Sequence, residues 1–152
     1  MHSLRQIQIL KTDLSEAWRF FSNPSNLATI TPASMNFRIT SLPYEGEMYA
    51  GQIINYKVTV APAITVKWIT EITHVRKPFF FVDEQRRGPY RFWHHQHHFR
   101  ETDNGVEMID EVNYEVPFGP LGRLVNHIFV GPQLERIFEY RTSVLKGIFP
   151  VT

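Results

Sequence analysis

The sequence contains no cysteine, no long apolar segment and almost no net charge, and each of these absences excludes a class of protein. Without cysteine there can be no disulfide and no thiolate metal site, and we expect a cytoplasmic protein. The formal net charge of +1 gives no general attraction to nucleic acid, so we expect no nucleic-acid partner. No apolar segment is long enough to span a bilayer and none near Met1 resembles a secretory signal, so we expect no stable membrane insertion.

Aromatic residues are what the sequence has in abundance. Phe, Tyr and Trp together make up 14% of the 152 residues. Large flat side chains in such number either fill a thick core or line a cavity. The chain is long enough to bury a proper core, and it shows no internal repeat, low-complexity tract or linker. We therefore expect residues 1–152 to form a single domain.

Alternation of polar and apolar residues predicts a sheet of six or seven strands. In residues 4–11, Ile7 and Ile9 lie on one face and Gln6 and Gln8 on the other. Further strands are predicted over six later segments: 37–39, 52–60, 64–75, 79–86, 92–101 and 106–116. They are separated by short segments rich in Pro, Gly or Asn, which favour antiparallel neighbours.

Helices are predicted at two places in the chain. Asp13 with Glu16 three residues later is a helix-capping pattern, and we expect two short helices after the first strand, over 14–21 and 25–30. Residues 120–149 have helical periodicity, and Pro132 predicts a bend near the middle. The apolar stripe of this long helix comprises Leu124, Ile128, Gly131, Leu134, Phe138, Arg141, Leu145 and Ile148. The fold class we predict is α+β, a curved antiparallel sheet around the long C-terminal helix.

The last predicted hairpin indicates which side chains face inward. Asn104-Gly105 is the favoured pair for a two-residue turn, which places Phe99 opposite Asp110 and His97 opposite Val112. The inner face then carries aromatic and aliphatic side chains together with two histidines and an aspartate: Trp93, His95, His97, Phe99, Asp110, Val112 and Tyr114. The preceding strand is expected to place Phe81, Asp83 and Gln85 beside them, so that Asp83 and Asp110 flank the histidines.

Several of these motifs resemble a known family. They are Phe20-Phe21-Ser22-Asn23-Pro24, the alternation of Trp93, His95, His97 and Phe99, then Asp110-Glu111-Val112, Gly119-Pro120-Leu121-Gly122 and Leu134-Glu135-Arg136-Ile137-Phe138. In this order they resemble bacterial ligand-binding proteins of the START/Bet v 1-like (SRPBCC) superfamily. The resemblance covers nearly the whole chain and implies a helix-grip fold with a cavity between sheet and helix. The superfamily includes lipid carriers, polyketide cyclases and chaperone activators, so the fold alone does not choose a function.

The function that we predict is binding of a small hydrophobic molecule, such as a lipid, quinone or polyketide-like compound, in this cavity. Aromatic side chains would bury the ligand and a few polar groups would orient it. The candidate ligand-binding residues are Phe81, Asp83, Gln85, Trp93, His95, His97, Phe99, Asp110, Val112, Tyr114, Leu134, Phe138 and Arg141.

Two other functions are kept as alternatives. His95, His97 and Asp110 are candidate acid–base residues of a cyclase or dehydratase, although no nucleophile elbow or phosphate loop is present. The chain can also be a module that binds a protein partner, which exposed apolar residues near Phe118 or along the helix flank would favour.

A metal site is the least favoured interpretation of the histidines. His95 and His97 lie on one face of a strand and can chelate a metal with Asp83 or Asp110. Two histidines without a matched third ligand are nevertheless weak grounds for a metal site, and we favour a hydrogen-bonded network in the cavity wall, because buried polar groups normally find partners. We therefore expect no metal and no cofactor.

Overall fold

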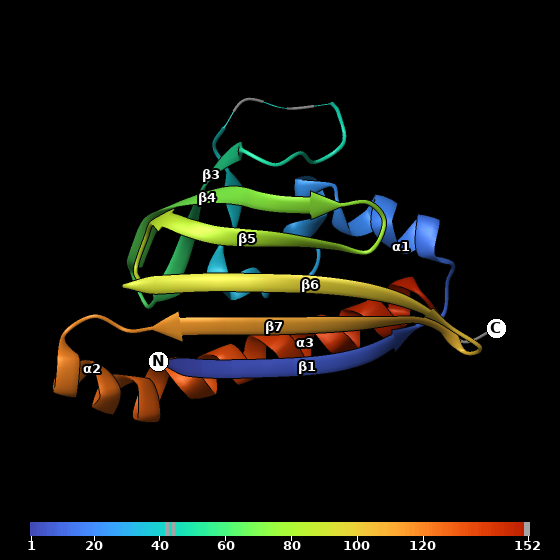
Figure 1. Ribbon diagram of the computed structural model, residues 1–152. Helices are drawn as coiled ribbons and strands as arrows, with labels where there is room; N and C mark the ends of the chain where they lie inside the picture. The colour runs from blue at the N-terminus through green and yellow to red at the C-terminus, as the bar shows by residue number, and fades with distance from the viewer. Residues whose placement is uncertain (42, 44, 151–152) are drawn as a thin grey trace.

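The computed structural model describes residues 1–41, 43 and 45–150. The described residues form a seven-stranded antiparallel sheet in the order β1-β7-β6-β5-β4-β3-β2, which curves over a long C-terminal helix (Figure 1). The strands are β1 (His2–Leu10), β2 (Arg38–Ile39), β3 (Gln52–Ala61), β4 (Ile64–Arg76), β5 (Phe80–Arg87), β6 (Phe92–Thr102) and β7 (Gly105–Glu115). The predicted α+β architecture is confirmed, and each predicted strand is present within a few residues of its expected bounds.

The short helices after β1 follow their capping residues. Helix α1 (Leu14–Phe21) begins where the Asp13 carboxylate accepts a hydrogen bond of 2.8 Å from the Glu16 backbone N–H. The second predicted helix, 25–30, is shorter and tighter than expected. A 3₁₀ turn, η1 (Pro24–Leu27), lies in its place. A second 3₁₀ turn, η2 (Ala33–Met35), follows it. The Thr31 hydroxyl donates to the Leu27 carbonyl over 2.6 Å, so a side chain takes the acceptor that would otherwise serve the backbone of a longer helix.

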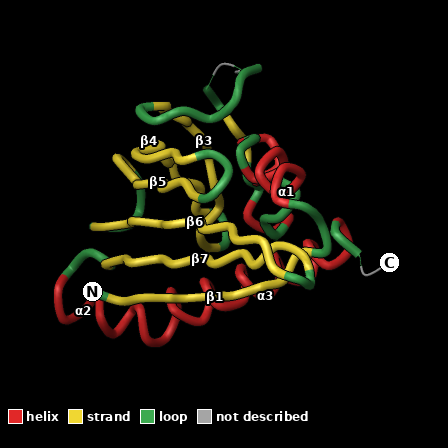
Figure 2. Tube along the Cα trace, turned by 45° about the vertical axis from the view of Figure 1, so that its right-hand side comes forward, coloured by secondary structure: helices red, strands yellow, loops and turns green. Residues whose placement is uncertain are grey.

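The C-terminal helix runs without a break from Gly119 to Ile148 in three parts. These are α2 (Gly119–Val125), a π-helical turn η3 (Asn126–Val130) and α3 (Gly131–Ile148). The π turn directly precedes Pro132, which lacks a backbone donor, so the hydrogen-bonding pattern changes where a bend was expected. Figure 2 shows α3 lying along one side of the sheet.

The predicted apolar stripe of this helix is buried only in its second part. Leu134, Phe138, Arg141 and Leu145 are buried, whereas the side chains of Leu124 and Ile128 are 54% and 67% exposed. The expectation for Leu124 and Ile128 is therefore wrong. Figure 1 shows the reason, because α2 lies beyond the end of β7 and has no strand to pack against.

The β6–β7 hairpin differs by one pair from the predicted register. Asn104-Gly105 is not its central pair; Thr102 lies opposite Gly105, and the two residues between them form the turn. Gly105 has a positive φ of 123° and Asn104 does not, so the turn that needs positive φ at both residues cannot form. The Thr102 hydroxyl closes the turn by donating to the Gly105 carbonyl over 2.9 Å. His97 consequently lies opposite Asp110 and not Val112, and Phe99 lies opposite Met108.

The inward-facing residues of the hairpin are nevertheless as predicted. A shift of one pair moves each residue by two positions, and side chains alternate with a period of two, so no residue changes face. The β5–β6 register is also confirmed, with Phe81 opposite His97 and Asp83 opposite His95. These pairings bring both histidines between the two aspartates in the middle of the sheet.

Candidate functional site

A cavity of about 180 Å³ lies between the sheet, the 3₁₀ turns and the C-terminal helix. Its wall is mainly aromatic and aliphatic, and includes Phe21, Ile54, Trp68, Phe81, Trp93 and Phe138. Eight of the thirteen predicted ligand-binding residues line it: Phe81, Asp83, Trp93, His95, His97, Leu134, Phe138 and Arg141. The predicted cavity between sheet and helix is thus present, and most of its predicted wall is in place.

Five predicted residues lie elsewhere. Val112 and Phe99 are packed in the core, and Tyr114 packs against Tyr90 and Trp93. Gln85 holds the β5–β6 connection, since its amide group donates to the Tyr90 carbonyl over 2.7 Å and accepts from the Tyr90 N–H over 3.1 Å.

Asp110 lies behind the histidines and not on the cavity wall. Asp110 lies on β7, and β6, which carries the histidines, separates β7 from β5. Asp110 therefore lies beside the histidines on the side away from Asp83.

Sequence reasoning missed the part of the wall that β3 and β4 supply. Ile54, Tyr56 and Val58 of β3 and Trp68 and Thr70 of β4 all line the cavity. Each set alternates along its strand, so a period of two was visible in the sequence. What the sequence did not show is that these two strands curve round to face the C-terminal helix from the far side of the pocket.

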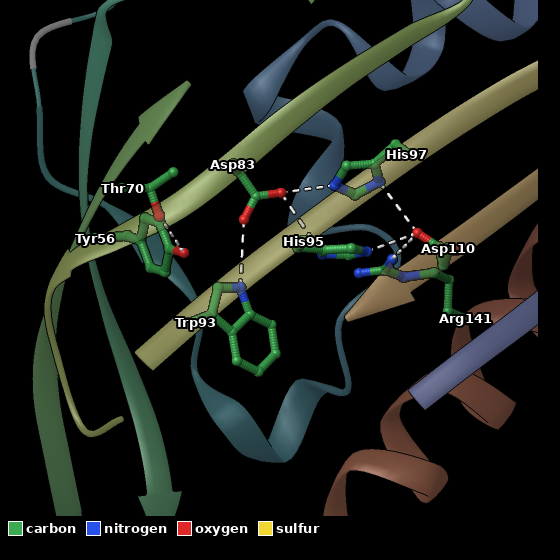
Figure 3. Close-up of polar contacts among 8 residues, drawn as sticks. All are labelled: Tyr56, Thr70, Asp83, Trp93, His95, His97, Asp110 and Arg141. Atoms are coloured by element: carbon green, nitrogen blue, oxygen red, sulfur yellow. Dashed lines mark hydrogen bonds and ion pairs between the residues drawn. The ribbon is translucent and has the colours of Figure 1, made fainter. Parts of the chain in front are cut away.

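Five ionisable side chains, four of which line the cavity, meet in one largely buried cluster (Figure 3): Asp83, His95, His97, Asp110 and Arg141. We call them the charged cluster. They come from β5, β6, β7 and α3, and the first four are adjacent because those three strands are neighbours in the sheet. Arg141 reaches them from the helix on the opposite side of the core. The charged cluster therefore connects the sheet to α3.

Asp83 contacts both histidines with one oxygen. Its Oδ2 accepts a hydrogen bond of 2.6 Å from His97 Nε2 and lies 3.5 Å from His95 Nδ1. Its Oδ1 accepts a longer bond of 3.4 Å from Trp93 Nε1. The Asp83 side chain is 16% exposed, which makes it the least buried member of the charged cluster.

Asp110 contacts the opposite nitrogen of each histidine. Its Oδ1 accepts from His95 Nε2 over 2.8 Å and from Arg141 Nη1 over 3.4 Å. The same oxygen lies 3.1 Å from His97 Nδ1, within ion-pair distance but outside hydrogen-bond geometry. The centroids of the two imidazole rings lie 3.7 Å apart with the ring planes tilted by 35°, and Phe81 stacks on His97. Both rings are thus held between two carboxylates.

The pKa values of the carboxyl groups show how the charges are balanced. Burial alone would raise the pKa of Asp110, but the Arg141 guanidinium and the two neighbouring histidines hold it well below its usual range. Burial also acts against ionisation of Asp83, and the two histidines outweigh it, so the Asp83 pKa is lowered as well. Both groups are therefore carboxylates at neutral pH.

The pKa values of the two histidines shift in opposite directions. Burial and the neighbouring His97 lower the pKa of His95, although both carboxylates act against them. For His97, burial lowers the pKa, and the contacts with Asp110 and Asp83 more than reverse this, so the pKa ends above its usual value. The most favourable state has His97 and Arg141 positive, Asp83 and Asp110 negative and His95 neutral, which leaves no net charge in the core.

A neutral phenol completes the polar part of the wall. The Tyr56 hydroxyl lies 2.9 Å from the Thr70 hydroxyl. Burial and the nearby Asp83 carboxylate raise the pKa of Tyr56 above its usual value, so the phenol stays protonated. It can donate or accept a hydrogen bond inside an otherwise apolar enclosure.

Comparison with solved structures identifies the fold. A Thermus thermophilus protein superposes with a TM-score of 0.72 at 13% identity, covering 96% of this chain and 95% of its own. A START superfamily protein from Mycobacterium smegmatis gives 0.71 at 9% identity, covering 97% and 99%. The major latex-like protein 151 of Panax ginseng gives 0.65 at 14% identity, covering 99% and 98%. This is the START/Bet v 1-like helix-grip fold.

The resemblance noted in the sequence is confirmed by this helix-grip fold. Likeness at such low identity shows the fold and does not transfer a function. No protein-family model matches the sequence, and a search of curated proteins gives no match. In the described part of the chain, none of the helices combines the length and apolar character needed to cross a membrane.

Proposed function

We propose that this helix-grip protein binds a small hydrophobic molecule that carries a polar group. The observation that supports the proposal is the cavity, whose wall is mainly aromatic and aliphatic and whose ionisable groups, Asp83, His95, His97 and Arg141, gather on one side. A mainly apolar enclosure with a few convergent polar groups is the usual form of a small-molecule site. Trp68, Trp93 and Phe138 would supply burial, and the polar groups would set the orientation.

The size of the cavity restricts the ligand. An engineered apolar cavity of about 150 Å³ accommodates benzene, and this one has about 180 Å³. A molecule with about one substituted ring therefore fits without rearrangement. A long acyl chain would require the 3₁₀ turns or the C-terminal helix to move outward.

The geometry favours binding over the acid–base alternative. A general base needs a nitrogen free to take a proton from the ligand. His95 Nε2 and His97 Nε2 are hydrogen-bonded to Asp110 and Asp83, and each ring's other nitrogen lies within 3.5 Å of the opposite carboxylate. With His97 positive and His95 neutral, a cyclase or dehydratase reaction would depend on His95 Nδ1, the one nitrogen of the two rings without a proton, which lies 3.5 Å from Asp83 Oδ2.

The test is native mass spectrometry of the purified protein, followed by denaturing extraction of any bound molecule. Ile137 lines the cavity, and Ile137→Trp should fill part of it and prevent binding. Ile128→Trp is the matched control, because Ile128 lies on the same helix and is exposed. A stoichiometric molecule that is lost only from Ile137→Trp supports the proposal. Equal occupancy in both variants contradicts it, as does an empty protein that takes up none of a panel of ring-sized hydrophobic probes.

A second candidate function is docking of a protein partner at the exposed part of the C-terminal helix. Phe118, Leu121, Leu124 and Ile128 are each more than half exposed there, and we call them the α2 face. Contiguous exposed apolar residues commonly mark interaction sites. From residue 116 to residue 134 the sequence carries Arg123 and His127 but no acidic residue, so the matching surface would be apolar with acidic side chains. Binding of one such partner that Leu124→Glu abolishes would support this function.

A further inference from the structure

Three ligand atoms converge at the cavity wall, one from each of three side chains. One nitrogen of His95, one nitrogen of His97 and one oxygen of Asp83 all lie within 4.8 Å of one another. His95 Nδ1 and His97 Nε2 are the nitrogens that approach Asp83 Oδ2. Figure 3 shows both rings with one edge directed toward Asp83 and the other toward Asp110. In the sequence alone, the two histidines have no matched third ligand. Asp83 is that ligand, because the β5–β6 register places it directly opposite His95.

We propose that Asp83, His95 and His97 bind a first-row divalent transition-metal cation, of the class of Zn²⁺ or Fe²⁺. Two imidazole nitrogens and one carboxylate oxygen are a common three-ligand set for such ions. The same three side chains reach the cavity of the proposed function, but metal binding and binding of a hydrophobic molecule do not require each other.

Asp110 and Arg141 supply the outer part of this site. A metal-bound histidine usually donates its other ring N–H to a carboxylate, which fixes the ring and its tautomer. Asp110 Oδ1 lies 2.8 Å from His95 Nε2 and 3.1 Å from His97 Nδ1, the nitrogen in each ring that does not face Asp83. Arg141 Nη1 lies 3.4 Å from the same oxygen and helps to hold it in place. Asp110 therefore orients His95 through a hydrogen bond and lies within ion-pair distance of the far nitrogen of His97.

The spacing of the ligand atoms needs only a small change. Ligand atoms about 2.1 Å from a tetrahedral metal lie about 3.4 Å from one another. The distance from His95 Nδ1 to Asp83 Oδ2 is already 3.5 Å, whereas that from His97 Nε2 to Asp83 Oδ2 is 2.6 Å. The cation would replace the proton between these last two atoms, and Asp83 would move back by about 0.8 Å. Asp83 is the least buried side chain of the set, so it has the most freedom to do so.

All three ligands also line the cavity, so the metal would have an open side. Metal sites that keep one coordination position for a water or a ligand are typically built from three protein ligands. The fourth position would face the apolar enclosure.

The experiment uses metal-free protein, prepared by dialysis against a chelator, and isothermal titration with Zn²⁺. Four histidines are consecutive apart from Gln96, and the outward-facing His94 and His98 can bind metal without the site. The His94→Ala/His98→Ala double variant removes them and is the matched control. We expect one Zn²⁺ per chain in both the wild type and this control. The affinity should fall at least tenfold in His95→Ala and in Asp83→Asn.

A second measurement keeps the test valid if His95→Ala is poorly folded. Co²⁺ bound to the His94→Ala/His98→Ala variant should give the visible absorption bands of a four-coordinate site. The conservative Asp110→Asn variant should weaken binding by about 10- to 100-fold, since it removes only the orienting carboxylate. Loss of stoichiometric binding in His94→Ala/His98→Ala, or unchanged affinity in folded Asp83→Asn, would overturn the proposal. So would a six-coordinate, water-like Co²⁺ spectrum.

Discussion

His97 Nε2 lies 2.6 Å from Asp83 Oδ2, and this contact joins β6 to β5 at the wall of the cavity. It combines a histidine whose pKa is raised with a carboxylate whose pKa is lowered, because in each case partners of opposite charge outweigh the effect of burial. His95, Trp93 and Asp110 each contact one member of this pair, and Arg141 contacts Asp110. The stability of the fold and the properties of the site are therefore linked.

Removing Asp110 should strongly destabilise the protein. In Asp110→Ala, Arg141 and the positive His97 lose their buried partner, and breaking a buried pair in this way costs about 3–5 kcal/mol. Urea denaturation followed by circular dichroism measures the loss. Asp103→Ala, in the exposed hairpin turn, should change the free energy of unfolding by less than about 0.5 kcal/mol. Equal losses in the two variants would show that Asp110 is not stabilised by these contacts.

Changing Asp83 should affect binding more than folding. Asp83→Asn keeps the shape of the side chain and can still accept from His97, but it loses the charge that attracts a cation or the polar group of a ligand. We expect a folded protein with a similar near-ultraviolet circular dichroism spectrum and at least tenfold weaker binding of the molecule or metal that the wild type binds. If Asp83→Asn is unfolded under native conditions, this carboxylate is needed for folding, which contradicts the prediction.

Stability of the metal-free protein should fall on both sides of neutral pH. Asp83 and Asp110 have lowered pKa values, so their contribution is present above the usual value of 3.8 and is lost as the pH falls through their folded-state values. His97 has a raised pKa, so its contribution is complete below 6.5 and is lost as the pH rises through its folded-state value. The free energy of unfolding from urea titrations at several pH values measures both limbs.

The alkaline limb provides the sharper comparison. His97→Gln removes the titrating group, so stability should no longer decline as the pH rises from neutral. His94→Gln, on the outer face, should retain the decline. If His97→Gln loses stability by the same amount as the pH rises, a titrating group other than His97 causes the decline.

Two glycines should respond oppositely to alanine. A Cβ at Gly105 would lie 2.2 Å from the Leu10 carbonyl oxygen, and φ there is +123°. Gly105→Ala should therefore destabilise the protein by more than about 1 kcal/mol. Gly147 lies within α3, and a Cβ added to it would have no neighbour within 4 Å, so Gly147→Ala should stabilise by up to about 1 kcal/mol. Thermal unfolding of the two variants gives the comparison, and stabilisation by both would contradict the close approach of β1.

Substitution of two leucines of the predicted helix stripe should change the stability by very different amounts. Leu134 is buried against Trp93 and its neighbours, and Leu134→Ala should cost about 2–5 kcal/mol. Leu124 is exposed on the α2 face, and Leu124→Ala should change stability by less than about 0.5 kcal/mol. Chemical denaturation of the isolated protein measures both. A large loss in Leu124→Ala would mean that the α2 face is covered in solution, for example by a second copy.

The sequence alone determined which face of each strand is buried and where most elements lie. A period of two assigns His95 and His97 to the inner face whatever the neighbouring strand does, because side chains alternate by geometry. The Asp13 carboxylate likewise determined the start of α1, since a cap acts on backbone groups within three residues. These are local effects, and the sequence carries all the information they need.

Only the tertiary structure decided which inner-face residues meet. Gly105 approaches the Leu10 backbone and takes the positive φ of the turn, which shifts the hairpin by one pair and places Asp110 opposite His97. The β5–β6 pairing then brings Asp83 to the same two histidines. The exposure of Leu124 and Ile128 was likewise decided by where the sheet ends. Periodicity describes one element at a time, whereas a site made by four elements depends on how they are aligned.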